Sequence, residues 1–263
     1  MTPGPAASAS QRYAALVSPD HRSRGPYAVL VPIGAVEQHG PHLPVGTDTW
    51  IATEIAERVA AGRSRVLVAE PIPVGASGHH LSFAGTLSLR PSTLVSVLVD
   101  LAASIAAHGD TPVFLNGHGG NRPALSLALQ ELLLEGVRAW SLSYFDELAD
   151  VLAEVFPDAS RAAGHACAME TSILSHLWPE AVSAETVPAA GGQAVWPDPS
   201  LFPDAHPQTN RPFEELNPVG VVGQPGLYHP EAGRRLVSAA VSRVGAAVDQ
   251  ILAQCGSASP AED

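Results

Sequence analysis

Short apolar runs alternate with longer segments of helical periodicity along the first half of the chain. Helices are predicted at Thr49–Ala61, Ser92–His108, Arg122–Glu135 and, near the end, Pro230–Gln254. Strand–helix alternation at this spacing predicts a mostly parallel sheet between two layers of helices, which is a three-layer α/β/α fold. The apolar runs predict strands that are buried on both faces, at Ala28–Ile33, Val66–Ala69, Pro112–Leu115 and Val137–Leu142.

The predicted helix ends carry recognisable residues. Asp48 is a candidate N-cap of the first helix, and Gly109 and Gly136 follow the ends of the second and third. A further helical stretch is expected from Ala166. The last helix has one apolar stripe, formed by Leu236, Ala240, Val244, Ala247 and Ile251.

Residues 187–227 break the pattern, because this stretch is rich in proline and glycine and has little periodicity. Loops of this length are typical of active-site lids, binding arms and oligomer contacts, and an ordered surface meander is an equal alternative. We expect one domain over residues 1–263, with an N-terminal extension (1–25), this insertion (187–227) and a frayed tail (256–263).

Composition and charge narrow the class of protein. The chain has 263 residues, a formal net charge of −12 and no basic run, which disfavours nucleic acid or an anionic membrane surface as the main partner. The apolar runs are shorter than a membrane span, and the N-terminus lacks the features of a secretory signal. Two cysteines cannot form a disulfide framework, so a cytoplasmic location is expected.

Acidic and histidine side chains follow the predicted strands where each strand ends. Glu37, His39 and Asp48 follow the first strand, and His118 follows the third. Ligands bind at the carboxyl ends of parallel strands, so we expect these side chains to meet. Carboxylate and imidazole suit Zn²⁺, Mn²⁺ or Fe²⁺, and a bridging Asp suits two ions about 3.5–4 Å apart. For Glu37 and His39 alone, a helix cap or a structural hydrogen bond is the alternative.

Two neighbouring motifs have competing interpretations. The glycines around His118 could cradle a phosphate, but they match neither G-x-G-x-x-G nor a Walker A loop, and a tight turn that presents His118 is favoured. Cys167 could be a thiol nucleophile, but its apolar neighbours favour packing. His165 and Glu170 are better candidates for the catalytic centre, with His165 as a proton shuttle.

Three motifs together resemble the creatininase (creatinine amidohydrolase) family. They are Gly34-x-x-Glu37-Gln38-His39-Gly40-Pro41-His42-Leu43-Pro44 with Asp48, Asn116-Gly-His118-Gly-Gly-Asn121, and His165-x4-Glu170-Thr171-Ser172, and the likeness extends through Phe83–Ser88. The resemblance covers roughly residues 28–255. It implies a three-layer α/β/α fold, a homo-oligomer such as a hexamer, and a dinuclear metal centre that hydrolyses an amide C–N bond.

The resemblance also implies a ligand set. Glu37, Asp48 and His118 would hold one metal ion, and His39 with Asp48 the other; a hydroxide bridging the ions would attack the amide, and His165 would protonate the leaving nitrogen. Creatininase has a further Glu ligand where this chain has Gly120, and we expect Glu170 to replace it. The substrate pocket is expected to include Ser77, His79, His80 and Gly119, the last of which replaces a tyrosine of creatininase that contacts the substrate.

The departures at Gly119, Gly120 and Gly164 argue against creatinine as the substrate. The Gly-Gly form resembles the branches of the family that include formamide deformylases and the peptidases of mycofactocin maturation. The expected substrate is therefore a cyclic amide, a formamide or a short peptide. A non-catalytic metal- or ligand-binding relative and a metal-assisted lyase or isomerase are the alternatives from other classes.

Overall fold

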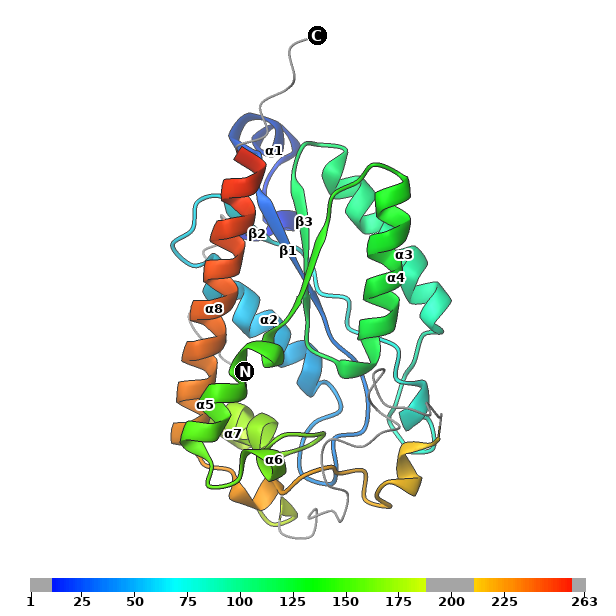
Figure 1. Cartoon of the computed structure of the whole chain (residues 1–263), viewed down its shortest axis with the longest axis vertical. Coiled ribbons are helices and arrows are strands. Elements are labelled where there is room, and N and C mark those ends of the chain that lie inside the picture. Colours follow the sequence, from blue (N-terminus) through cyan, green and yellow to red (C-terminus); the bar gives the residue numbers. More distant parts are fainter. Residues whose placement is uncertain (1–10, 188–210, 257–263) are drawn as a thin grey trace.

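The computed structural model describes residues 11–187 and 211–256. Its centre is a parallel sheet of β1 (Ala28–Ile33), β2 (Val66–Val68), β3 (Thr111–Asn116) and β4 (Trp140–Ser143), in the spatial order β2-β1-β3-β4. All three neighbouring pairs are parallel, with Ala28 opposite Val66 on one side of β1 and opposite Thr111 on the other. The predicted strands and the three-layer α/β/α fold are confirmed (Figure 1).

The strands separate two apolar cores because successive side chains point to opposite faces. On β1, Leu30 belongs to one core, whereas Val29 and Val31 belong to the other. On β3 the same alternation places Leu115 in the first core and Phe114 in the second. Both strands therefore need a continuous apolar run, and both sequences contain one.

Helices cover the two faces as two separate layers (Figure 1). The first core packs under α2 (Thr47–Ala60), α7 (Ala168–Leu177) and α8 (Pro230–Gly256), and the second under α3 (Pro91–Ala106) and α4 (Arg122–Leu134). Within the described ranges, the remaining α-helices are short: α1 (Ser18–Arg24), α5 (Ala149–Val155) and α6 (Ala159–Ala162).

Three local expectations are wrong. The edge strand β4 is only partly buried, because β3 is its one neighbour in the sheet. The first helix begins at Thr47 after Gly46, so Asp48 lies inside its first turn and is not its N-cap. On α8 the buried stripe continues through Val248 rather than Ala247, which is only partly buried.

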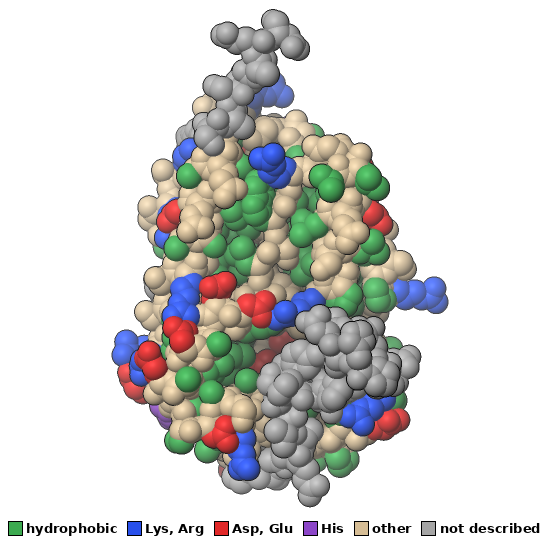
Figure 2. Space-filling model, in the orientation of Figure 1, with side chains coloured by type: hydrophobic (Ala, Val, Ile, Leu, Met, Phe, Trp, Pro, Cys, Tyr) green, Lys and Arg blue, Asp and Glu red, His purple; other side chains and the backbone are tan. Residues whose placement is uncertain are grey.

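By length and composition, α8 is the one helix in residues 11–187 and 211–256 that is apolar enough to cross a membrane. Its buried side chains pack on the sheet, while Arg235 and Arg243 on its outer side pair with Glu154 and Asp150 of α5. Basic and acidic side chains alternate over this part of the surface, as Figure 2 shows. The helix is thus an amphipathic cover of the sheet.

The strand order creates a switch point between β1 and β3. The chain leaves β1 toward β2 on one side, and β3 then pairs with the opposite side of β1 before leading to β4. The loops after β1 and β3 consequently diverge at the carboxyl edge of the sheet, where ligands bind in open α/β folds. Both acidic and histidine motifs lie in these loops.

The predicted insertion at 187–227 falls partly outside the described residues, at 188–210. Its described part runs along the carboxyl edge of the sheet, where Val222 forms an isolated antiparallel bridge with His165. Both backbone hydrogen bonds of this bridge are present, at 3.0 and 2.9 Å. We call residues 211–224 the arm, because this segment brings the end of the insertion to the motif residues.

Candidate active site

A first group of three ligand atoms forms where β1, α2 and β3 meet. Glu37 comes from the loop after β1, Asp48 from the first turn of α2, and His118 from the loop after β3. His118 Nδ1 lies 3.3 Å from Glu37 Oε1 and 3.2 Å from Asp48 Oδ2. All three side chains are buried.

A second group shares Asp48 and adds the first turn of α7. His39 Nε2 lies 3.2 Å from Asp48 Oδ1 and 3.7 Å from Glu170 Oε1. These residues are also buried, and their ligand atoms lie within 4.8 Å of one another. Asp48 therefore offers one oxygen atom to each group.

The two groups have the electrostatics of a cation site. Glu37, Asp48 and Glu170 are buried carboxylates, and the ion pairs that the described residues make with them are all with histidines. Glu37 Oε1, His39 Nε2 and Asp48 Oδ2 are buried atoms without a hydrogen-bond partner among the described residues. Buried charge without compensation is costly, and a metal ion shared by these atoms would supply the compensation.

The histidine pKa values record the same excess of negative charge. Burial lowers the pKa of His118, but Glu37 and Asp48 together raise it to about 10. Burial also lowers the pKa of His39, and Asp48 and Glu170 raise it well above its ordinary value. The site thus attracts a positive charge between each imidazole and its carboxylates, either a proton or a metal ion.

Backbone carbonyls orient both rings for ligation. His118 Nε2 lies 3.3 Å from the carbonyl oxygen of Ala76, and His39 Nδ1 lies 3.4 Å from that of Glu37. A carbonyl only accepts, so each of these nitrogens carries a ring hydrogen, and the other nitrogen, which faces the carboxylates, can ligate an ion once the ion replaces the proton there. This is the usual support of a metal-binding histidine.

Each outer carboxylate is held by one of its two oxygens. Ser77 Oγ donates to Glu37 Oε2 at 2.6 Å, so Ser77, a predicted pocket residue, contacts a predicted ligand directly. At the start of α7, the backbone N–H of Cys167 donates to Glu170 Oε2 at 3.1 Å, an arrangement typical of a capping box. In both cases the remaining oxygen, Oε1, faces the histidines.

Cys167 is placed for packing and capping rather than for nucleophilic attack. It is fully buried in the first core. Burial and the Glu170 carboxylate raise the pKa of the Cys167 thiol well above its ordinary value, whereas a reactive cysteine needs a lowered pKa.

His165 is brought to the centre by an unusual backbone. Gly164 has a φ of 144°, and a Cβ there would lie 2.1 Å from the carbonyl oxygen of Val222; Ala166 has a φ of 49°. His165 Nε2 donates to the carbonyl oxygen of Gln38 at 2.7 Å, and its Nδ1 lies 3.4 Å from Glu37 Oε1. Burial, and next the charge of His39, lower the pKa of His165 to about 3.

His79 and His80 lie beside these ligands in the loop after β2. The His79 ring stacks on His118 with centroids 5.7 Å apart, and His80 Nε2 lies 3.6 Å from Glu37 Oε1. Phe213 of the arm contacts the rings of His79, His80 and His165. Burial is the main cause that lowers the pKa of His79, to about 4, and that of His80 still further.

The two glycines after His118 differ in their surroundings. A Cβ at Gly120 would lie 2.4 Å from His118 Nε2 and 2.5 Å from the carbonyl oxygen of Ala76, so the packing leaves no room for a side chain there. A Cβ at Gly119 would meet nothing within 4 Å. The predicted pocket position thus faces open space, while the neighbouring position must be glycine.

Some residues at the site were not predicted from the sequence, because their contacts join distant segments. Gln38 bonds to His80 and Gly220, and Phe213 packs on three histidines. His42 Nε2 forms a hydrogen bond of 3.0 Å with Thr171 Oγ1, and this bond ties the first motif to α7. The signal that could have found Gln38 and His42 is their position next to Glu37 and His39 in the first motif.

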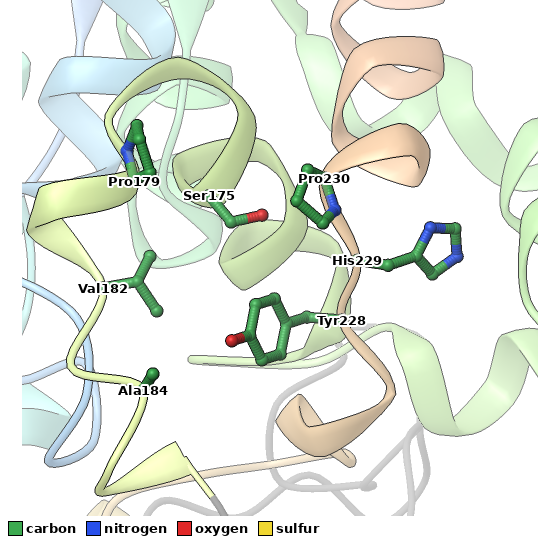
Figure 3. A pocket seen from close by; sticks show the side chains of 7 residues that line it. All are labelled: Ser175, Pro179, Val182, Ala184, Tyr228, His229 and Pro230. Atoms are coloured by element: carbon green, nitrogen blue, oxygen red, sulfur yellow. The ribbon is translucent and has the colours of Figure 1, made fainter.

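A cavity of about 370 Å³ lies apart from these groups (Figure 3). Its wall carries no acidic side chain and none of the ligand atoms described above, so the chemistry is not centred there. The lining comes from α7, the turn after it and the start of α8: Ser175, Pro179, Val182, Ala184, Tyr228, His229 and Pro230.

The fold and this geometry define a class of protein. It comprises three-layer α/β/α proteins whose carboxylate–histidine centre lies at the carboxyl edge of a parallel sheet. Within that class the family is identified by direct comparison. The family model described as creatinine amidohydrolase matches residues 16–248, and the chain belongs to this creatininase family.

Individual relatives agree with this assignment. The mycofactocin precursor peptide peptidase of Mycobacterium ulcerans is 38% identical over 233 residues, which cover 82% of this chain and 84% of the relative. A solved manganese form of creatininase matches with a TM-score of 0.72 at 26% identity, over 91% of this chain and 98% of its own. A solved creatininase of the Zn-Zn type matches with a TM-score of 0.70 at 25% identity, over 90% and 96%. The chain is a hydrolase that acts on carbon–nitrogen bonds.

Proposed function

We propose that the chain is a metal-dependent amidohydrolase that cleaves an amide bond in a peptide. The observation that carries this proposal is Asp48, whose two oxygens belong to two different groups of ligand atoms. Glu37, Asp48 and His118 would hold one divalent ion, and His39, Asp48 and Glu170 the other. When bound, two such ions polarise a carbonyl group and lower the pKa of a coordinated water.

The donor set supports zinc, manganese or iron. Carboxylate and imidazole ligands suit all three ions, and no thiolate is among the proposed ligands to favour zinc alone. The manganese and zinc forms of the solved creatininases are in line with this choice. Glu170 would take the place of the side chain that Gly120 lacks.

His165 would carry the proton that amide hydrolysis has to move. Its Nε2 hydrogen is engaged by the carbonyl oxygen of Gln38, so Nδ1 is the ring atom that can accept a proton from water and pass it to the leaving nitrogen. A neutral imidazole is needed for the first of these steps, and the lowered pKa of His165 provides it near pH 7.

A peptide is favoured over a compact cyclic amide by the open space at Gly119 and by the similarity to the mycofactocin precursor peptide peptidase. His79 and Phe213 would form the wall next to the peptide, because they lie side by side at the ligand groups. Ser77 would act on Glu37 rather than on the substrate.

The test is to incubate the manganese- or zinc-loaded chain with precursor-like peptides, lactams and formamides in H₂¹⁸O, and to identify products by mass spectrometry. We expect a cleaved peptide whose new carboxylate carries the label. Cleavage of formamides or lactams alone would refute the peptide preference. A metal-loaded chain that cleaves none of them would refute the enzymatic proposal, and the Asp48→Ala variant controls for contaminating peptidases.

A further inference from the structure

Gln38 lies between the two ligand residues Glu37 and His39, yet its side chain points to other partners. Its Oε1 accepts the backbone N–H of Gly40 at 2.9 Å, and its Nε2 donates to the carbonyl oxygen of Gly220 at 2.9 Å. Because a backbone N–H only donates and a carbonyl only accepts, these two bonds fix which end of the amide is oxygen and which is nitrogen.

The second hydrogen of the Gln38 amide determines the tautomer of His80. Gln38 Nε2 lies 2.9 Å from His80 Nδ1, and since this nitrogen of Gln38 donates, His80 Nδ1 must accept. The hydrogen of the neutral His80 ring is therefore on Nε2, the atom that faces Glu37 Oε1 at 3.6 Å.

The backbone carbonyl of Gln38 orients the ring of His165 the other way round, with its unprotonated nitrogen toward Glu37. The carbonyl oxygen of Gln38 accepts from His165 Nε2 at 2.7 Å, which leaves His165 Nδ1 unprotonated at 3.4 Å from Glu37 Oε1. His165 Nε2 also lies 3.1 Å from Gln38 Nε2, but both atoms already donate elsewhere, so this approach is not a further hydrogen bond.

We propose that Gln38 is a positioning residue that fixes the tautomers of His80 and His165 so that a hydrogen-bond donor and a proton acceptor face the same edge of the site. Both rings carry their hydrogen on Nε2, but His80 turns that nitrogen toward Glu37 and His165 turns its bare Nδ1 there. Amide hydrolysis needs both: a donor for the charge that develops on the carbonyl oxygen, and an acceptor for the proton of water. The use made of the two nitrogens rests on the proposed function, whereas the tautomers do not.

The same arrangement decides the status of a third group of candidate ligand atoms, from Glu37, His79 and His80. Its His80 atom closest to Glu37, Nε2, carries a hydrogen and cannot ligate an ion in this tautomer. Gln38 thereby removes His80 Nε2 as a ligand beside Glu37, whereas the group of Glu37, His39 and His165 keeps an unprotonated Nδ1 on His165.

The direct test is NMR of the zinc-loaded chain with ¹⁵N-labelled histidine, because long-range proton–nitrogen spectra distinguish protonated from unprotonated ring nitrogens. His80→Asn and His165→Asn variants assign the signals. We expect a protonated Nε2 on both rings and an unprotonated Nδ1 on both. A wild-type His80 protonated on Nδ1 would overturn the proposal without any variant.

The variant Gln38→Glu preserves the shape of the side chain but removes its N–H donors. His80 must then donate through Nδ1, so its tautomer reverses, while His165 keeps its bond to the main chain. Loss of an oriented donor typically lowers kcat by about 10²–10³-fold, and we expect this change with little effect on KM and with both zinc ions retained. An unchanged His80 spectrum, or a reversed tautomer with wild-type kcat, would overturn the proposal.

Gln224→Glu is the matched control, because it introduces the same chemical change at the end of the arm. We expect it to leave the His80 spectrum and kcat unchanged; a similar loss in this control would show that Gln38→Glu acts through charge alone and overturn the proposal. If no amide substrate is found, the spectra still decide the tautomers, so the two proposals fail separately.

Discussion

Asp48 joins the two groups of ligand atoms through a single carboxylate, so its removal tests both at once. We predict that Asp48→Ala loses both metal ions and the hydrolytic activity, because each group keeps only two of its three ligands. Metal analysis after gel filtration measures the first effect. Glu54→Ala on the same helix, which removes a carboxylate paired with Arg58, should retain both ions. An Asp48→Ala variant with two bound ions would disprove the bridging role.

A substitution at Glu170 tests the two proposed ion sites independently, because Glu170 belongs to only one of them. In Glu170→Gln the first group remains intact, so we predict the loss of one ion and a fall in kcat/KM of at least about 10²-fold, since even residues that only support ligands contribute 10–100-fold. Cys167→Ala serves as the control, because it removes only the weak hydrogen bond of 3.5 Å from the thiol to Glu170 Oε2 and keeps the backbone N–H that holds this carboxylate. Loss of activity in the control would restore the thiol nucleophile as a hypothesis.

The ligand residues could be proposed from the sequence because their types and spacing are specific, but their supports could not. Ser77 and Glu37 are 40 residues apart, and Gln38 reaches Gly220 across 182. Such contacts depend on the side-chain orientation that tertiary packing imposes, which no local pattern encodes. The roles assigned to the predicted site residues stay predictions until metal binding and turnover are measured.

At the scale of elements, the arm is the segment whose small changes should affect chemistry more than folding. Gly220 has a φ of 74°, and a Cβ there would lie 2.0 Å from Gln38 Oε1. We predict that Gly220→Ala costs about 1–2 kcal/mol in backbone conformation and displaces the Gln38 amide, lowering kcat by about 10²-fold. Circular dichroism and steady-state kinetics measure the two effects.

Gly226→Ala is the matched control for this prediction. It lies in the short 3₁₀ turn Pro225–Leu227, and an added Cβ would meet nothing within 4 Å. We expect wild-type kcat and an unchanged melting temperature. Equal activity in the two variants would contradict the role of the arm.

The elements themselves were predictable to different degrees. β1 was predicted with its observed bounds because both of its faces are buried and its run is continuous. The start of α2 was misplaced by two residues, since Asp48 has the composition of an N-cap while Thr47 already lies in the helix. The side chain that looked like a cap is instead held between His39 and His118.

For the whole molecule, metal removal should lower stability as well as activity. Three carboxylates are buried together, and once the ions leave, only protons taken up by histidines such as His39 and His118 offset their charge. An ion present at about 100 times its Kd adds about 2.7 kcal/mol, which corresponds to roughly 5–10 °C in Tm for a domain of this size. We predict such a fall on chelation and recovery with manganese or zinc, measured by calorimetry. An unchanged Tm in the ion-free chain would contradict a buried cation centre.

The three-layer arrangement follows from the sequence because strand–helix alternation allows few topologies. Assembly is different: the expected homo-oligomer depends on surfaces of two chains, and it stays a prediction. Leu133 and Leu134 at the end of α4 are 75% and 88% exposed. The periodic pattern that identified the two cores does not account for these two apolar side chains.

The pairing of His165 with Val222 also bears on how the enzyme matures in the cell. A chain leaving the ribosome presents Glu37, His39 and Asp48 early, but Glu170 only after all four strands β1–β4 have been synthesised, and the partner of His165 later still. Glu37, His39 and Asp48 alone form an incomplete set of ligands, which would bind an ion weakly. If the proposed metal centre is formed, capture of the cations would therefore be a late event of biogenesis, and the ions available after translation would determine which ones the enzyme keeps.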